Sequence, residues 1–126
     1  MKQEVKSEQR VDGNGNPAGG TARGTGIVID WQNGPLKHTD PSGLVVERKP
    51  TGAFVEGVIQ AVLDRMQFYQ QTQFACLENE AAIECLEEAL SHLNSRTARR
   101  EAAGIEGTHQ EDTPSTEERD FTLPSI

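Results

Sequence analysis

Hydrophobic residues recur at three- and four-residue intervals along two stretches of the sequence. The repeating positions are Val55, Val58, Ile59, Val62, Leu63, Met66 and Tyr69 in the first stretch, and Ala82, Ile83, Leu86, Ala89, Leu90, Leu93 and Thr97 in the second. This period places the apolar side chains of each stretch on one face of an α-helix. The short polar link QQTQFAC forces the two helices to run antiparallel. The pattern therefore predicts a helical hairpin over residues 53–103, with Gly104 as its C-terminal stop.

Two short β-prone runs precede the predicted helices. IVIDW, from Ile27 to Trp31, and GLVVER, from Gly43 to Arg48, are rich in β-branched residues, and the turn signal QNGPL lies between them. We expect a β-hairpin region over residues 27–48, which must pack against the helices because an isolated hairpin is marginally stable. Together with the helical hairpin, this region predicts an α+β fold.

The two ends of the chain have a different composition. Residues 1–25 are crowded with Gly and Asn, and residues 110–126 are acidic and contain two prolines. Such segments lack the apolar surface that folding needs. We expect a disordered Gly-rich arm over 1–25, a binding domain over 26–109 and a disordered acidic tail over 110–126, with both ends dispensable for binding.

Charge and composition narrow the classes of function. Twenty acidic and 12 basic residues give a net charge of −8, which argues against binding to duplex nucleic acid or to an acidic membrane. The sequence has neither a run of 18 apolar residues nor the apolar stretch of a secretory signal, so we expect a cytoplasmic protein that does not contact the membrane. Only 34% of the residues are hydrophobic, which predicts a thin core and favours association into an oligomer.

The residues with reactive side chains form no familiar catalytic or metal-binding pattern. Cys76 and Cys85 match no metal-ligand spacing and are predicted to be buried free thiols. The three histidines are scattered, and no nucleophile is paired with a base. We therefore expect no catalytic residues, no metal, no cofactor and no enzymatic activity.

Three arginines stand out within the acidic helical segment. Arg96, Arg99 and Arg100 fall within about one turn of the second predicted helix. Their guanidinium groups match the oxygens of a phosphate with two parallel hydrogen bonds. Alternatively, they pair with Glu101 and with the negative C-terminal end of their own helix.

Five motifs follow one another in the helical segment: Asp64-Arg65, Phe68-Tyr69, FACLEN (Phe74 to Asn79), LEEAL (Leu86 to Leu90) and LNSRTARREAAGIEGTH (Leu93 to His109). Their order resembles that of phage proteins that sequester immune signalling nucleotides. The resemblance spans residues 54–109, and its most specific piece is RTxxR followed by GIEGTH. Leu77 departs from the family, which usually has arginine at this position in the motif CREN.

Two related groups share this helical segment: the Thoeris anti-defence proteins, which resemble sponges for cyclic ADP-ribose isomers, and the anti-CBASS sponges for cyclic oligonucleotides. The preceding IDWQNGPL and a further β-prone run favour the Thoeris group, whose members are similar in having a β-rich N-terminal portion. The resemblance implies non-catalytic capture of a cyclic ADP-ribose isomer in the cytoplasm of a bacterial host. The alternatives are a sponge for cyclic di- or trinucleotides, a helical-hairpin adaptor for a protein partner, and a nucleotide hydrolase.

The resemblance also implies roles for particular residues. Tyr69 would stack on an adenine, Asn79 would contact the same base or its ribose, and Arg96 and Arg100 would hold the pyrophosphate. An aromatic ring suits a purine and arginine suits a phosphate. Alternatively, Tyr69 packs in the core and Asn79 satisfies backbone donors in the first turn of its helix. Further candidate ligand-binding residues are Phe74, Arg99, Thr108 and His109.

Thr108 and His109 belong to the GIEGTH segment just after the second predicted helix. This segment offers a hydroxyl group and backbone N–H groups, which suit an anion. Related sponges use a second surface of this kind for larger cyclic oligonucleotides, and the resemblance assigns both residues to such a surface. Alternatively, the segment only ends the helix.

The spacing of the candidate residues predicts a site shared between two subunits. Asn79 and Arg96 are 17 residues apart on one predicted helix, which corresponds to about 25 Å at 1.5 Å per residue. One small nucleotide cannot reach both residues within one chain. We therefore expect a homodimer, or a trimer of dimers, in which the second helices run antiparallel across a two-fold axis and form two equivalent sites.

Overall fold

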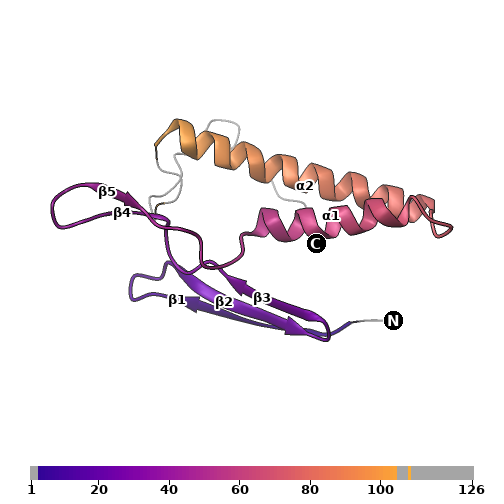
Figure 1. Ribbon diagram of the computed structural model, residues 1–126, viewed down its shortest axis with the longest axis horizontal. Coiled ribbons are helices and arrows are strands. Elements are labelled where there is room, and N and C mark those ends of the chain that lie inside the picture. The colour runs from indigo at the N-terminus through magenta and orange to yellow at the C-terminus, as the bar shows by residue number, and fades with distance from the viewer. Residues whose placement is uncertain (1–2, 105–107, 109–126) are drawn as a thin grey trace.

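The computed structural model describes residues 3–104 and residue 108 (Figure 1). Within these residues, five strands precede two helices. The elements are β1 (Val5–Val11), β2 (Pro17–Gly24), β3 (Ile27–Trp31), β4 (Lys37–Thr39), β5 (Val45–Glu47), α1 (Val55–Tyr69) and α2 (Leu77–Ala102). The predicted α+β fold is confirmed.

β1, β2 and β3 form an antiparallel sheet with β2 in the centre. The prediction of a disordered arm over residues 1–25 is therefore wrong for residues 5–24, which contain two of the three strands. The glycines of β2 allow the strands to approach each other closely. A Cβ atom at Gly20 would clash with the carbonyl oxygen of Glu8, and Gly20 has a φ of +147°. Backbone pairing, rather than large apolar side chains, makes this segment a sheet.

The turn between β1 and β2 is held by an aspartate. The carboxylate of Asp12 accepts hydrogen bonds from the backbone N–H groups of Asn14 and Asn16 at 2.8 and 3.0 Å. Side chains of this type stabilise tight turns by bonding to the backbone a few residues further on. The Asn- and Gly-rich composition that predicted disorder thus belongs to a hairpin turn.

The two strands expected to pair over residues 27–48 take other partners. β3 pairs with β2, and β5 pairs with β4 in a separate two-stranded hairpin. Asp40 closes this second hairpin, because its carboxylate accepts hydrogen bonds from the N–H groups of Ser42 and Leu44 at 2.9 and 3.0 Å. The expected pairing is wrong because β2, assigned to a disordered arm, offers β3 a longer and nearer partner.

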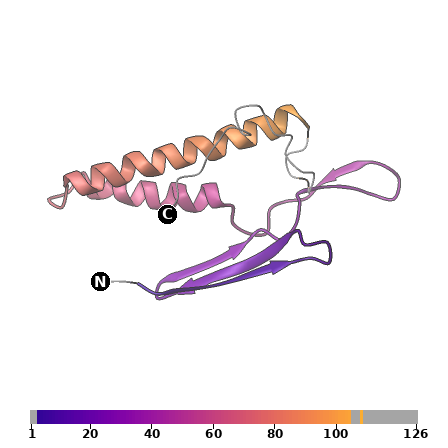
Figure 2. The same cartoon turned by 180° about the vertical axis from the view of Figure 1, so that it is seen from behind.

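The predicted helical hairpin over residues 53–103 is confirmed. α1 and α2 lie side by side and run antiparallel, as the two opposite views show (Figures 1 and 2). Gln70 fixes the turn between them. Its side chain donates to the carbonyl oxygen of Cys76 and accepts from the N–H of the same residue, both at 3.1 Å. Gly104 follows α2 with a φ of +73°, the conformation expected of a glycine stop.

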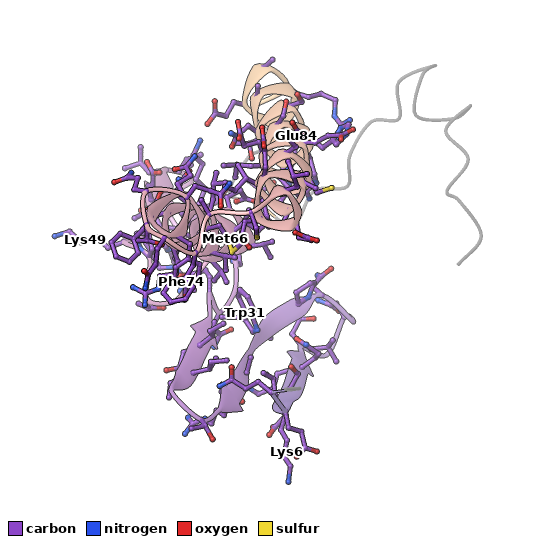
Figure 3. The ribbon with its side chains drawn as sticks, turned by 90° about the vertical axis from the view of Figure 1, so that its right-hand side faces the viewer. Lys6, Trp31, Lys49, Met66, Phe74 and Glu84 are labelled. Atoms are coloured by element: carbon purple, nitrogen blue, oxygen red, sulfur yellow. The ribbon has the colours of Figure 1, made fainter. Side chains whose placement is uncertain are left out.

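Two backbone hydrogen bonds join the end of β3 to the segment just before α1. The N–H of Gln32 donates to the carbonyl of Ala53 at 3.0 Å, and the N–H of Ala53 donates to the carbonyl of Asp30 at 2.7 Å. The view along the helices shows the hairpin and the sheet as two layers, with Trp31 on the side of the sheet that faces the hairpin (Figure 3). α1 therefore starts from a defined point at the end of β3.

Few side chains of the single chain are buried. Within residues 3–104, the buried hydrophobic residues are Ala22 and Leu63. Val55 and Val62, which belong to the predicted apolar face of α1, are exposed, and an open apolar groove of about 590 Å³ separates β3 from α1. The predicted thin core is confirmed.

Both cysteines lie on the surface of the helical hairpin. Cys76 and Cys85 are free but exposed, so the prediction that they are buried is wrong. Their positions fall outside the half-buried face that α2 turns toward α1.

Neither described helix is long and apolar enough to cross a membrane.

Candidate functional site

Tyr69 lies at the C-terminal end of α1, next to the hairpin turn, and is half-buried. Its hydroxyl accepts a hydrogen bond from Nε of Arg65 at 3.2 Å. The same guanidinium lies 5.0 Å from the centre of the Tyr69 ring and 5.2 Å from that of Phe68. Tyr69 is thus a partly accessible ring with a cation beside it, rather than a buried core residue.

Asn79 lies in the first turn of α2 and is also half-buried. Its amide nitrogen donates to the carbonyl oxygen of Phe74 at 3.3 Å, while the Phe74 side chain is 69% exposed. The helix has no side-chain cap at Cys76. The side chain of Asn79 therefore organises the turn rather than capping the helix.

Backbone and hydroxyl hydrogen bonds connect these residues into one turn. The hydroxyl of Thr72 donates to the carbonyl of Tyr69 at 2.6 Å and accepts from the N–H of Phe74 at 3.1 Å. Asn79 then binds the carbonyl of Phe74. We call Tyr69, Phe74 and Asn79 the turn cluster, because this network holds all three at the same end of the hairpin.

The three candidate arginines lie at the opposite end of α2, and we call them the arginine cluster. Arg96 is exposed, Arg99 is half-buried and Arg100 is buried, with 5% of its surface exposed. Each of the three makes at least one further interaction in the folded chain. Arg99 and Arg100 occupy the last turn of the helix, where a positive charge is stabilised by the helix dipole.

Arg100 binds the chain that follows the helix. Its guanidinium donates to the carbonyl oxygen of Thr108 at 3.2 Å. Thr108 is half-buried, whereas His109 and residues 105–107 lie outside the described residues. Of the expected anion site in GIEGTH, the structure therefore describes only Gly104 and Thr108.

The structure does not bring the turn cluster and the arginine cluster together in one chain. α2 is a single continuous helix from Leu77 to Ala102. Asn79 and Arg96 are therefore separated by about 25 Å along its axis. Each chain therefore carries two separate candidate half-sites, the turn cluster at one end of the hairpin and the arginine cluster at the other.

The two candidate half-sites contain groups that suit the recognition of a nucleotide. An aromatic ring and an amide suit a nucleobase, and guanidinium groups suit a pyrophosphate. Within the described residues, no group of three or more His, Cys, Asp or Glu side chains is placed to hold a metal ion. Sequence reasoning assigned no role to Arg65, although its spacing of three and four residues from Phe68 and Tyr69 is the signal that predicts the contact.

Comparison with known proteins supports the resemblance seen in these motifs. No family model matches the sequence. The chain is 48% identical over 68 residues to a protein named Thoeris anti-defense 1 from Bacillus phage SBSphiJ7. The matched segment covers 54% of this chain and 48% of that relative, so the match spans about half the length of the relative. The predicted resemblance to a Thoeris anti-defence protein is confirmed.

Proposed function

We propose that this chain acts against Thoeris immunity by binding a cyclic ADP-ribose isomer and withholding it from the host effector. The observation that carries the proposal is the 48% identity to Thoeris anti-defense 1. The ligand class comes from the resemblance of the helical motifs. The two half-sites support it, because a cyclic ADP-ribose contains both an adenine and a pyrophosphate.

The proposed site combines the half-sites of two chains. Two α2 helices that pair antiparallel bring the turn cluster of one chain beside the arginine cluster of its partner. A two-fold axis then generates two equivalent sites. The exposed apolar side chains of the single chain support association, because burial of apolar surface stabilises an interface.

The proposed action is capture without cleavage. The guanidinium groups of Arg96 and Arg100 offer hydrogen-bond donors and no acceptor, so they can hold phosphate oxygens but cannot act as a general base. Tyr69 and Asn79 supply a ring face and an amide, which suit the holding of a nucleotide rather than its cleavage. The bound molecule should therefore be released intact.

Native mass spectrometry of the full chain with a panel of cyclic nucleotides tests the proposal. We expect the mass of a dimer or a larger assembly carrying one cyclic ADP-ribose isomer per site. Heating the complex should release a molecule that co-elutes with the input on chromatography.

Other results would point to the alternatives. Binding of cyclic di- or trinucleotides alone would make the chain a sponge for those signals, and a cleaved product would make it a hydrolase. A chain that retains no nucleotide would fit an adaptor for a protein partner.

A further inference from the structure

Arg65 has no role in the ligand contacts assigned from the sequence, yet it lies beside the ring proposed to stack on the base. Arg65, Phe68 and Tyr69 occupy one face of the last turns of α1, because residues three and four positions apart are neighbours on a helix. The side chain of Arg65 is exposed. Packing in a hydrophobic core therefore does not explain why Arg65 lies at this position.

One guanidinium group contacts both aromatic rings. The centres of the Phe68 and Tyr69 rings are 6.1 Å apart with a tilt of 46° between the planes. The carbon at the centre of the Arg65 guanidinium lies within about 5 Å of each ring centre, at 5.2 and 5.0 Å. Its Nε also donates to the Tyr69 hydroxyl. Tyr69 is thus held at its ring and at its hydroxyl by a single planar group.

We propose that Arg65 is a positioning residue that fixes the Tyr69 ring in the orientation that stacks on the ligand. This inference rests on the proposed function. Phe68 is 49% exposed and Tyr69 is half-buried, so neighbouring atoms alone leave both rings partly free to change rotamer. A ring that is ordered before binding loses less conformational entropy when the base stacks on it.

Replacement by lysine separates this role from a simple effect of charge. Arg65→Lys keeps the positive charge that attracts an anionic ligand, but an ammonium group has neither the plane nor the Nε donor. If Arg65 acts by positioning, the lysine variant should bind the cyclic ADP-ribose isomer about threefold to tenfold more weakly, which corresponds to the entropy of one immobilised side chain. If it acts by charge alone, the affinity should be unchanged.

The single tyrosine of the chain allows the ring itself to be observed. Tyr69 is the only tyrosine, so labelling the full chain with 3-fluorotyrosine gives one fluorinated site. We expect a ¹⁹F resonance shifted away from that of the free amino acid in the unliganded protein. In Arg65→Lys the resonance should move toward the free value and narrow, because the ring moves more freely. Arg10→Lys, the same substitution on exposed β1, is the matched control and should change neither the spectrum nor the affinity.

The outcomes separate the inference from the proposed function. Failure of the wild-type chain to bind any cyclic ADP-ribose isomer contradicts the proposed function. Tight binding by both wild type and Arg65→Lys overturns the positioning role while leaving the function intact. A weaker variant with an unchanged Tyr69 resonance also overturns it, because the loss would then come from a direct contact between Arg65 and the ligand.

Discussion

At the scale of single residues, the structure separates arginines that the sequence treats alike. Arg96 and Arg100 are both assigned to the pyrophosphate by resemblance, but Arg96 is exposed and Arg100 is buried against the carbonyl of Thr108. Four positions along a helix place them on the same side, but the carbonyl oxygen of Thr108 lies within hydrogen-bond distance of Arg100. Helical spacing does not predict this contact.

This difference predicts different effects on stability. Arg100→Ala should lower the free energy of unfolding by about 1–3 kcal/mol, because it removes a partly buried charged hydrogen bond. Arg96→Ala should change it by less than about 0.5 kcal/mol, as is usual at exposed positions. Urea unfolding followed by circular dichroism measures both. Equal midpoints for the two variants would contradict a structural role for Arg100.

Asp40 gives a prediction that depends on pH. Hydrogen bonds from the Ser42 side chain and then from the Leu44 backbone lower the pKa of the Asp40 carboxyl group below its ordinary value. Because the pKa is lower in the folded hairpin, the stabilising effect is complete above the ordinary pKa of aspartate and is lost as the pH falls through the lowered value. Ser42→Ala should raise this pKa in an NMR titration. An unchanged pKa would show that the backbone bonds alone hold the carboxylate.

At the scale of elements, hydrophobic periodicity predicted both helices correctly, whereas amino-acid composition predicted disorder in a segment that forms β1 and β2. The apolar repeats of α1 and α2 are long enough to define a helix face, so both helices and the glycine after α2 were predictable. β1 is exposed along its whole length and β2 is rich in glycine, so neither carries a hydrophobic pattern that sequence analysis can detect. Their stability depends on pairing between segments.

Gly20 tests this account of the sheet. Gly20→Ala should destabilise the chain by more than about 1 kcal/mol, because alanine disfavours a positive φ and its Cβ would meet the backbone of Glu8. Gly13→Ala is the matched control, since no atom lies within 4 Å of a Cβ there and its φ is not positive. Amide hydrogen exchange across β1 and β2 should rise only in the Gly20 variant. If both variants exchange alike, close approach at Gly20 does not maintain the sheet.

At the scale of the whole molecule, the length of α2 governs the proposed site. Tyr69, Phe74 and Asn79 are brought together by the hairpin turn, whereas the arginine cluster is held at the far end of a helix of 26 residues. The sequence predicted this separation because it depends only on helical rise. The spacing of Arg65 from Phe68 and Tyr69 makes their contact predictable, but the hydrogen bond from Arg100 to Thr108 depends on tertiary structure that helical spacing does not predict.

A site shared between two chains predicts that two damaged subunits can restore each other. Tyr69→Ala removes the stacking ring from the turn cluster, and Arg96→Ala removes an exposed guanidinium from the arginine cluster. Either homodimer should bind a cyclic ADP-ribose isomer at least about fivefold more weakly, because base stacking and charged hydrogen bonds each contribute about 1 kcal/mol or more. Arg96 is preferable to Arg100 here, because its loss should leave the fold intact.

In a mixed dimer of these two variants, one site carries both substitutions and the other carries neither. Heterodimers purified with two different affinity tags should therefore regain the affinity of the wild type at one site per dimer, measured by isothermal titration calorimetry. Recovery to half the wild-type stoichiometry is possible only if each pocket takes its ring from one chain and its arginine from the other. Heterodimers that bind as weakly as the parent homodimers would show that Tyr69 and Arg96 serve separate sites, and the antiparallel pairing of α2 would then be wrong.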